Sequence, residues 1–299
     1  MELRELRAFV AVVEEGGMSP AARRLHVSQP GLSKAMNGLE REFGVKLLVR
    51  SSRGVQATEA GQTFLGEARA VLARYDQAVR VMAEFMNVGS GVLRVGIPLE
   101  LPSDLLVSAL ARFAEQCPDT RVQARHLSTA GQLAALRAGE LDLGLLRERP
   151  TGQELDTMLV VKEHLGVILP ADCAVELSGP DGIPLEALDR LEWVGFPRSG
   201  SPAWYDELTS ILRSHGLAIG AQPPDGHDLT LEVKLAAVGT RRAFALAPNE
   251  WARTLPPAIA WSPLAGHPIT RRTWAVWPAG SRRRDLGMFI VALDRPVLD

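Results

Sequence analysis

Residues 21–44, AARRLHVSQPGLSKAMNGLEREFG, decide the fold of the N-terminal part of the chain. Ser28 is a good N-cap residue, and the apolar residues after it recur at helical spacing, at Leu32, Met36, Leu39 and Phe43. The sequence therefore predicts a helix from Ser28 to about Phe43, ended by Gly44. A shorter helix, Pro20–Leu25, with Ser19 as its cap, precedes it across a two-residue turn. Two helices joined by a tight turn predict a helix-turn-helix.

The flanking segments extend this motif into a winged module. Upstream, Leu3–Glu15 has apolar residues at spacings of three and four, and Gly16-Gly17 ends the predicted helix. Downstream, the apolar runs Val45–Val49 and Gly54–Ala57 flank a basic tip. We interpret these runs as a two-stranded wing. Residues 1–58 are therefore predicted to form a winged helix-turn-helix domain.

The second helix of a helix-turn-helix inserts its N-terminal residues into the major groove of DNA. At those positions stand Ser28, Gln29, Pro30, Ser33 and Lys34. Glutamine can pair with adenine, and serine and lysine can reach base edges or phosphates, while Arg50 and Arg53 at the wing would bind phosphates. Each of these charges alone would be an ordinary solvated surface charge. Together in one winged module they predict DNA binding.

An ordered series of motifs in this part of the chain resembles the LysR-type transcriptional regulators. The series is LRAFVAV (6–12), AARRLHVSQP (21–30), LS (32–33), LE (39–40), LLVR (47–50) and TEAG (58–61). The resemblance implies DNA contacts by Gln29, Pro30, Ser33, Lys34, Arg50 and Arg53, and Ser28 is added from the cap geometry. The chain departs from the family at Gly31, where a better helix former is usual.

A long helix is predicted to follow, capped by Thr58 and running to about Asn87. Its apolar stripe consists of Leu65, Ala68, Leu72, Tyr75, Val79, Met82 and Met86. The near-heptad spacing favours a coiled coil with a second copy, and packing against the chain's own C-terminal body is the alternative. The resemblance implies a dimer through this helix, often a tetramer, and two-fold symmetry predicts an inverted-repeat operator. We assign residues 59–90 to this linker helix and a hinge.

From Val92 onward, predicted strands alternate with helices, which is typical of an α/β fold with a parallel sheet covered by helices on both faces. Residues 91–299 divide into two similar lobes with crossings near Val160–Glu163 and Pro263–Thr270. Lobe I covers about 91–161 and 268–299, and lobe II about 162–267. The resemblance implies an effector-binding domain like a periplasmic binding protein, with a small co-inducer between the lobes.

Ligands of open α/β sheets bind beyond the carboxyl ends of the strands. The candidate effector-binding residues at such positions, or at helix starts, are Pro98, Leu99, Glu100, Ser128, Thr129, Arg147, Arg198, Ser199, Gly200, Ser201 and Trp204. Hydroxyls, helix N-termini and either arginine would suit a carboxylate, although either arginine could equally be an exposed charge. Glu100 stands where the family often has a hydroxyl and would repel an anion. It could select an amine, bind another cationic group or face water.

Composition narrows the class of protein. The chain holds 33 basic and 35 acidic residues, and this balance alone argues against nucleic acid. The overall charge balance hides an uneven distribution along the chain. Residues 19–53 hold seven basic residues against two acidic ones, while the remainder of the chain has an acidic excess. Two cysteines, no apolar run of membrane length and a charged first segment predict a cytoplasmic protein without a disulfide, membrane span or signal peptide. The resemblance implies that the protein is bacterial.

The predicted function is sequence-specific transcription regulation controlled by a small effector, and such a protein could also contact RNA polymerase. No nucleotide-binding, nucleophile-elbow or zinc-protease motif occurs and the six histidines are scattered, so neither an enzyme, a metal nor a further cofactor is expected. Two alternatives stay open. A ligand-binding module whose N-terminal helices serve only dimerisation would bind no DNA, and an unrecognised enzyme on the α/β body would turn its ligand over.

Overall fold

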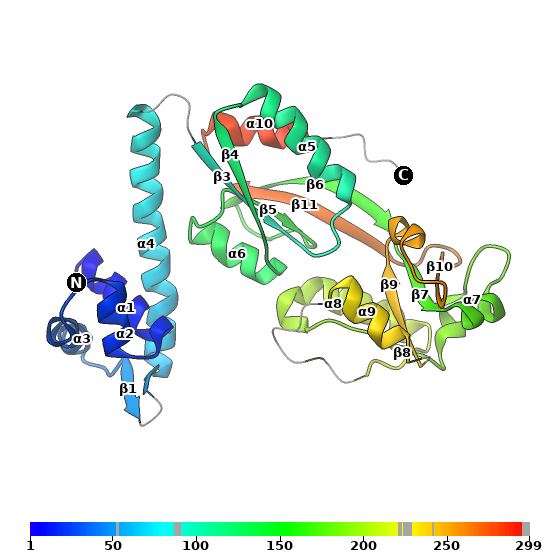
Figure 1. Ribbon diagram of the computed structural model, residues 1–299, viewed down its shortest axis with the longest axis horizontal. Helices are drawn as coiled ribbons and strands as arrows, with labels where there is room; N and C mark the ends of the chain where they lie inside the picture. Colours follow the sequence, from blue (N-terminus) through cyan, green and yellow to red (C-terminus); the bar gives the residue numbers. More distant parts are fainter. Residues whose placement is uncertain (52–53, 87–90, 221–222, 224–228, 241, 295–299) are drawn as a thin grey trace. The chain divides into compact units, whose positions relative to one another are not determined.

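The computed structural model describes residues 1–51, 54–86, 91–220, 223, 229–240 and 242–294 (Figure 1). The chain divides into two compact units, one at residues 1–88 and the other formed by 89–136 and 141–299. The elements of the first unit are α1 (Leu3–Glu15), α2 (Met18–Arg24), α3 (Gln29–Phe43), β1 (Leu48–Ser51), β2 (Gly54–Ala57) and α4 (Glu59–Met86).

Local signals fix most helix ends of the first unit. Gly16 ends α1 in the left-handed conformation at φ 63°, and the Ser28 hydroxyl accepts a hydrogen bond from the Gly31 amide at the start of α3. Helix α2 begins at Met18, after Gly17, so the expected Ser19 cap is wrong. Met18 is buried in the core of the unit, and this packing explains the earlier start.

The wing is joined to α4 by a tight contact. The Thr58 amide donates to the Leu47 carbonyl (2.9 Å) and the Thr58 hydroxyl donates to the Lys46 carbonyl (2.7 Å). The same hydroxyl accepts from the Gly61 amide at 3.0 Å, as the predicted cap requires. A Cβ atom on Gly61 would lie 2.1 Å from the Leu47 carbonyl oxygen. The TEAG motif thus supplies a cap and a glycine where the backbone just before β1 approaches closely.

The apolar stripe of α4 has two parts. Leu65 and Ala68 are buried in the core of the first unit, so this half serves packing within the unit. Farther along, Tyr75, Val79 and Met82 are exposed. The side chain of Met86 lies outside the described residues. The exposed part is therefore the apolar surface that a second copy could cover.

Lobe I of the second unit is built on a five-stranded sheet of order β4-β3-β5-β11-β6. Its elements are β3 (Gly91–Ile97), α5 (Ser103–Gln116), β4 (Thr120–His126), α6 (Thr129–Arg137), β5 (Leu143–Leu146), β6 (Leu155–His164), β11 (Thr270–Pro278) and α10 (Arg284–Leu293). Helices α5 and α10 pack together on one face, against Leu145, and α6 covers the other face, against Leu146 (Figure 1).

Lobe II is built on a four-stranded sheet of order β10-β7-β9-β8. Its elements are β7 (Gly166–Pro170), α7 (Ala171–Leu177), β8 (Glu192–Trp193), α8 (Pro202–Ser214), α9 (Leu231–Val238), β9 (Ala243–Ala247) and β10 (Ile259–Ser262), with short 3₁₀ turns at Leu185–Leu188, Arg198–Gly200 and Asn249–Arg253. Helix α8 packs against Val167 and Leu169, and α9 against Ile168, so the two helices lie on opposite faces.

Both sheets are mixed, which corrects the expected parallel sheet. In lobe I, β4, β3 and β5 are parallel, whereas β11 is antiparallel to both β5 and β6. Strands β6 and β11 carry the chain out of lobe I and back, so they run in opposite directions. They pair as far as His164 and Thr270, which places the first crossing later than Val160–Glu163.

Candidate functional site

The exposed N-terminal part of α3 presents the predicted DNA-contacting residues. Leu32, Met36 and Leu39 are buried in the core of the first unit. At its N-terminal end, Ser28, Gln29, Pro30 and Lys34 are exposed and Ser33 is half-buried. Positions 29, 30, 33 and 34 share one helical face, since they are spaced by about one turn. Folding thus brings these five residues together on one exposed face.

One of the two carboxylates in the basic segment is used inside the module. Glu40 accepts hydrogen bonds from Lys46 Nζ (2.6 Å) and from the amides of Leu47 (3.0 Å) and Leu48 (3.1 Å). Burial would raise the pKa of the Glu40 carboxyl, but these hydrogen bonds more than offset it and hold the pKa below its usual value. Glu40 therefore fixes the start of β1 relative to α3.

Of the two arginines predicted at the wing, the structure describes only the backbone of Arg50. Arg50 lies on β1, which pairs antiparallel with β2, and its backbone partner is Val55. The side chain of Arg50 and the whole of Arg53 lie outside the described residues. The two-stranded wing itself is present as predicted.

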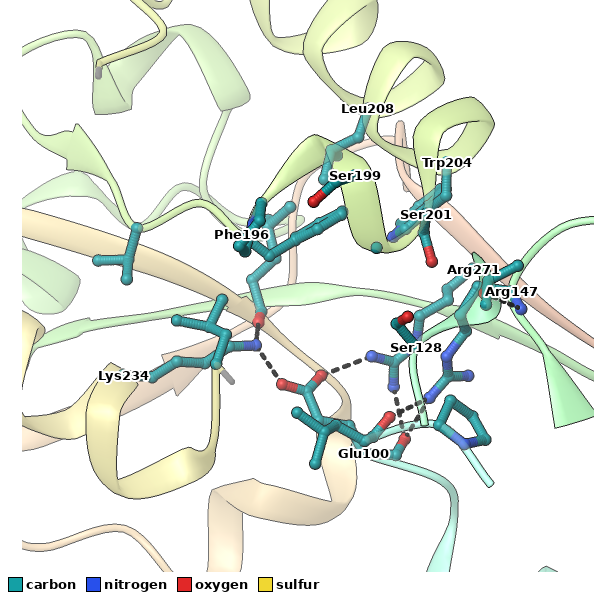
Figure 2. Close-up of a pocket in the computed structure, with 18 of the residues that line it drawn as sticks. Glu100, Ser128, Arg147, Phe196, Ser199, Ser201, Trp204, Leu208, Lys234 and Arg271 are labelled. Carbon is teal, nitrogen blue, oxygen red and sulfur yellow. Dashed lines mark hydrogen bonds and ion pairs between the residues drawn. The ribbon is translucent and has the colours of Figure 1, made fainter. Parts of the chain in front are cut away.

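A cavity of about 500 Å³ lies between lobe I and lobe II. Ten of the eleven candidate effector-binding residues line it, namely Pro98, Leu99, Glu100, Ser128, Thr129, Arg147, Ser199, Gly200, Ser201 and Trp204. A cavity of this size falls within the range of small-molecule sites. Figure 2 shows charged side chains along one side of it and α8, with Trp204, along the opposite side.

Arg198 does not line the cavity. Its Nε and Nη2 atoms donate to the two carboxylate oxygens of Asp206 at 2.7 and 2.6 Å, and its side chain is 51% exposed. This pair holds Arg198 at the surface of the Arg198–Gly200 turn. The assignment of Arg198 to the effector site is therefore corrected to that of a surface ion pair.

Glu100 belongs to a group of five charged residues, here called the charged cluster: Glu100, Arg147, Glu163, Lys234 and Arg271. The Glu100 carboxylate lies between Lys234 Nζ (2.5 Å) and Arg271 Nη1 (2.6 Å), as Figure 2 shows. Arg271 Nε is also 3.0 Å from a Glu163 oxygen, to which Arg147 Nη1 is 3.7 Å distant. The carboxylate of Glu100 thus faces two cations of the chain and is not directed to water or held free for an amine.

The backbone of Glu100 is held as firmly as its side chain. Its carbonyl oxygen accepts hydrogen bonds from Arg147 Nη2 (2.8 Å) and Arg271 Nη2 (3.1 Å), and the Leu99 carbonyl accepts another from Arg147 (2.6 Å). Glu100 has φ 59°, in the left-handed region that residues other than glycine rarely adopt. Such strain persists where surrounding contacts enforce it, which is common at binding sites.

Burial and neighbouring charges shift the pKa values of the cluster. Burial lowers the pKa of the Arg147 guanidinium to about 9, and repulsion from Arg271 adds to the effect. Burial also lowers the pKa of Lys234, although Glu100 opposes the shift. For Glu100 itself, burial would raise the pKa, but Lys234 and Arg271 outweigh it and the net shift is downward. The carboxylate is therefore ionised at neutral pH.

Sequence reasoning missed Lys234, Arg271 and Glu163. Lys234 is a buried residue on α9, where Glu232 is the other charged residue, and its ammonium also donates to the Leu246 carbonyl at 2.6 Å. Arg271 alternates with Thr273 and Ala275 on the buried side of β11. A lysine within a largely apolar helix and an arginine on the buried side of a strand were signals in the sequence. No signal in the sequence indicated that Glu100 is the common partner of Lys234 and Arg271.

The N-terminus of α8, a predicted position for a ligand carboxylate, is occupied by a side chain of lobe I. A Glu148 carboxylate oxygen accepts from the amides of Ala203 (2.9 Å) and Trp204 (3.2 Å). Ser201 stands at the N-cap position of α8 but makes no capping hydrogen bond with its side chain. Glu148 thus caps a helix of the opposite lobe.

Neither a metal-binding cluster nor a membrane-spanning helix occurs within the described ranges. No group of three or more histidine, cysteine, aspartate or glutamate side chains there could hold a metal ion. None of the helices described has the length and apolar character needed to cross a membrane.

Family models match both parts of the chain. Residues 3–62 match the model described as bacterial regulatory helix-turn-helix protein, lysR family. Residues 87–293 match the model described as LysR substrate binding domain. The two matches together span most of the sequence.

Individual proteins resemble the chain over almost its full length. The Hca operon transcriptional activator HcaR of Escherichia coli is 32% identical over 291 residues, with 97% of this chain and 96% of HcaR covered. The uncharacterised regulator YnfL of the same species is 32% identical, and the match covers 93% of this chain and 92% of YnfL. The crystal structure of CbnR, a LysR family transcriptional regulator, superposes with a TM-score of 0.73 at 26% identity, over 100% of both chains. The structure of full-length CbnR complexed with its target DNA gives a TM-score of 0.70 at 25% identity, covering 98% of this chain and 99% of that one.

Proposed function

This chain belongs to the LysR family of DNA-binding transcriptional regulators, and on that premise we propose that the exposed face of α3 reads an operator while a small effector in the interlobe cavity modulates the binding. The observation that carries the DNA-binding part is the single exposed face formed by Ser28, Gln29, Pro30, Ser33 and Lys34. Gln29 and Ser33 would contact base edges, and Lys34 would contact a phosphate or a base. Arg50 and Arg53 of the wing would contact the backbone.

We propose that two copies pair through α4. Tyr75, Val79 and Met82 are exposed apolar residues at spacings of four and three, as expected of a helix that meets a second helix. A two-fold dimer places two α3 helices in successive major grooves, so the operator would be an inverted repeat with half-sites one helical turn or its multiples apart. Pairing of two such dimers would give a tetramer. The protein would act in the cytoplasm, where RNA polymerase is a further candidate partner.

A mobility-shift assay against the DNA upstream of the protein's own gene tests the DNA-binding role. We expect a specific shift that unlabelled operator competes away and scrambled DNA of equal length does not. Gln29→Ala should relax the sequence preference, whereas Arg213→Ala, at an exposed arginine on α8 of the second unit, serves as a control. Ligand binding without any specific shift would instead favour the plain binding module.

Effector control is tested by footprinting with and without ligand. A ligand that binds one closure of the lobes better than another shifts the balance between them. In a tetramer this shift would alter the spacing of the DNA-binding dimers and the DNA bend. We expect the footprint to change at saturating ligand. An unchanged footprint would refute this mechanism, and turnover of the ligand would favour an enzyme.

A further inference from the structure

We propose that the ligand of the interlobe cavity is a small molecule with an apolar body and a single negative charge, such as a monocarboxylate. We further propose that Glu100 sets this limit of one charge. Both statements rest on the proposed role of the cavity as the effector site. The proposal rests on the charges that the chain buries around the cavity, on the position of Glu100 among them, and on the apolar character of the opposite wall.

The charged cluster contains one more cation than carboxylate. Within the described part of the chain, it comprises the cations Arg147, Lys234 and Arg271 and the carboxylates Glu100 and Glu163. Arg147, Lys234 and Arg271 are all buried, with side chains 7%, 5% and 6% exposed. A buried charge is costly unless it is paired. One negative charge from a ligand would therefore balance the cluster.

Arg147 is the cation with the weakest pairing. Its distance to the Glu163 oxygen is 3.7 Å, and that oxygen is closer to Arg271. The hydrogen bonds that Arg147 donates go to neutral acceptors, the Thr273 hydroxyl and the carbonyls of residues 99 and 100. Arg147 also lines the cavity. A carboxylate entering the cavity would thus find a buried guanidinium that the chain itself compensates only in part.

Glu100 already fills the position of a second anion. Its carboxylate lies between Lys234 of lobe II and Arg271 of β11, within hydrogen-bond distance of both. Its left-handed backbone and the arginines that bind its carbonyl keep it there. At the α8 N-terminus, Glu148 takes the two amides that could have bound another carboxylate. A dianion would leave the cluster with a negative excess beside Glu100.

The opposite wall suits an apolar body. Trp193, Phe196, Trp204 and Leu208 line the cavity there, and the hydroxyl residues Ser128, Ser199 and Ser201 add neutral polar groups. Figure 2 shows Phe196, Trp204 and Leu208 on the side away from the Glu100 carboxylate. A ligand whose charge lies near Arg147 can therefore place its apolar part against these residues.

Calorimetry on the full-length protein with two matched series of probes tests the charge. The ring series is benzoate, benzamide, terephthalate and benzylamine, and the chain series is hexanoate, hexanamide, adipate and hexylamine. We expect the monocarboxylate of at least one series to bind about tenfold or more tightly than its amide, its diacid and its amine, as a charge-assisted hydrogen bond implies. Preference for a neutral, doubly negative or cationic probe, or no binding by any probe, would overturn the proposal.

Variants test the role of Glu100. Glu100→Gln leaves the cluster one unit more positive, so the diacid should gain about tenfold over the monocarboxylate. Glu163→Gln makes the same change in charge but keeps the ion pair between Glu100 and Lys234. It therefore provides the test if the Glu100→Gln protein does not fold. Glu176→Gln, an exposed carboxylate on α7, is the matched control and should leave the ranking unchanged. An unchanged ranking in a folded Glu100→Gln or Glu163→Gln protein would refute the charge limit.

The mobility-shift assay separates this proposal from the proposed function. If monocarboxylates bind in the expected order but leave DNA binding and the footprint unchanged, the charge limit stands and the effector role fails. If a ligand of different charge binds the cavity and alters the footprint, the effector role stands and the charge limit fails.

Discussion

The DNA-binding module and the interlobe cavity use charge in opposite ways. In the module, Lys34 is exposed to solvent on the face where the DNA would bind. At the cavity, three buried cations are packed against two partly buried carboxylates. An exposed charge costs little to keep and acts with its neighbours on a polyanion. A buried charge depends on each of its partners, so the cavity should tolerate substitution far less well than the surface.

The largest effect is expected from breaking the buried cluster. Arg271→Met should destabilise the second unit by about 3–5 kcal/mol, because it leaves two carboxylates short of a buried partner. Arg272→Met, at the next residue, removes a half-exposed side chain 3.6 Å from Glu207 and should cost about 0–1 kcal/mol. Urea unfolding followed by tryptophan fluorescence measures both, since all six tryptophans lie at residues 193–277. Equal losses would contradict the contrast between buried and exposed charge.

Two glycines on α4 test how tightly the backbone of the DNA-binding module is packed. The comparison is with the cavity, where the charged side chains are the sensitive groups. Gly61→Ala should destabilise the module by about 1–3 kcal/mol, because its Cβ would lie 2.1 Å from the Leu47 carbonyl oxygen. Gly66→Ala meets nothing within 4 Å and should stabilise the same helix by up to about 1 kcal/mol. Far-ultraviolet circular dichroism during thermal unfolding measures both changes. A stabilising Gly61→Ala would show that the contact can relax.

Two residues on α3 should separate affinity from sequence reading. Gln29→Ala should cost about 1–3 kcal/mol on the preferred operator and relax the preference at one base pair. Lys34→Ala should weaken binding to all sequences to a similar degree and reduce the salt slope by about one. Titrations on operator and scrambled DNA at several salt concentrations measure these effects. A change in base preference by Lys34→Ala would assign it to base reading instead.

The smallest effect is expected from pH in the neutral range. A bound anion stabilises the protonated form of Arg147, whose pKa is about 9 and which faces Arg271, Glu163 and Glu100. Affinity for a monocarboxylate should therefore be nearly constant between about pH 6 and 8 and be lost as pH rises through about 9. The lowered pKa of Lys234 acts in the same direction. Calorimetry across this range measures the dependence, and affinity that rises above pH 9 would exclude Arg147 as the anion partner.

The sequence predicted the first unit well because its signals are local. The bounds of α1 and the caps at Ser28 and Thr58 follow from residues within one turn of each helix end. The start of α2 was misplaced because the burial of Met18 is a tertiary effect. At Gly31, helix propensity alone indicates a cost, but a Cβ there would lie 3.0 Å from the Ser28 hydroxyl, so glycine leaves room for the cap.

The sequence predicted which positions line the cavity, but it did not predict how their charged side chains pair. The rule that ligands bind at strand ends found residues such as Ser128 and Arg147, because it depends only on the order of strands and helices. The partners of Glu100 could not be found in this way. Arg271 reaches Glu100 through the pairing of distant segments within lobe I, and Lys234 reaches it from lobe II, so the local sequence of none of the three predicts the contact.

The capping of α8 by Glu148 links a helix end in one lobe to a carboxylate in the other. The amides of Ala203 and Trp204 keep this hydrogen-bond partner only while the lobes stay together. Each separation of the lobes should open both amides to deuterium exchange without unfolding α8. The exchange rate of these two amides therefore reports how often the lobes part, and a ligand that holds the lobes together should slow it.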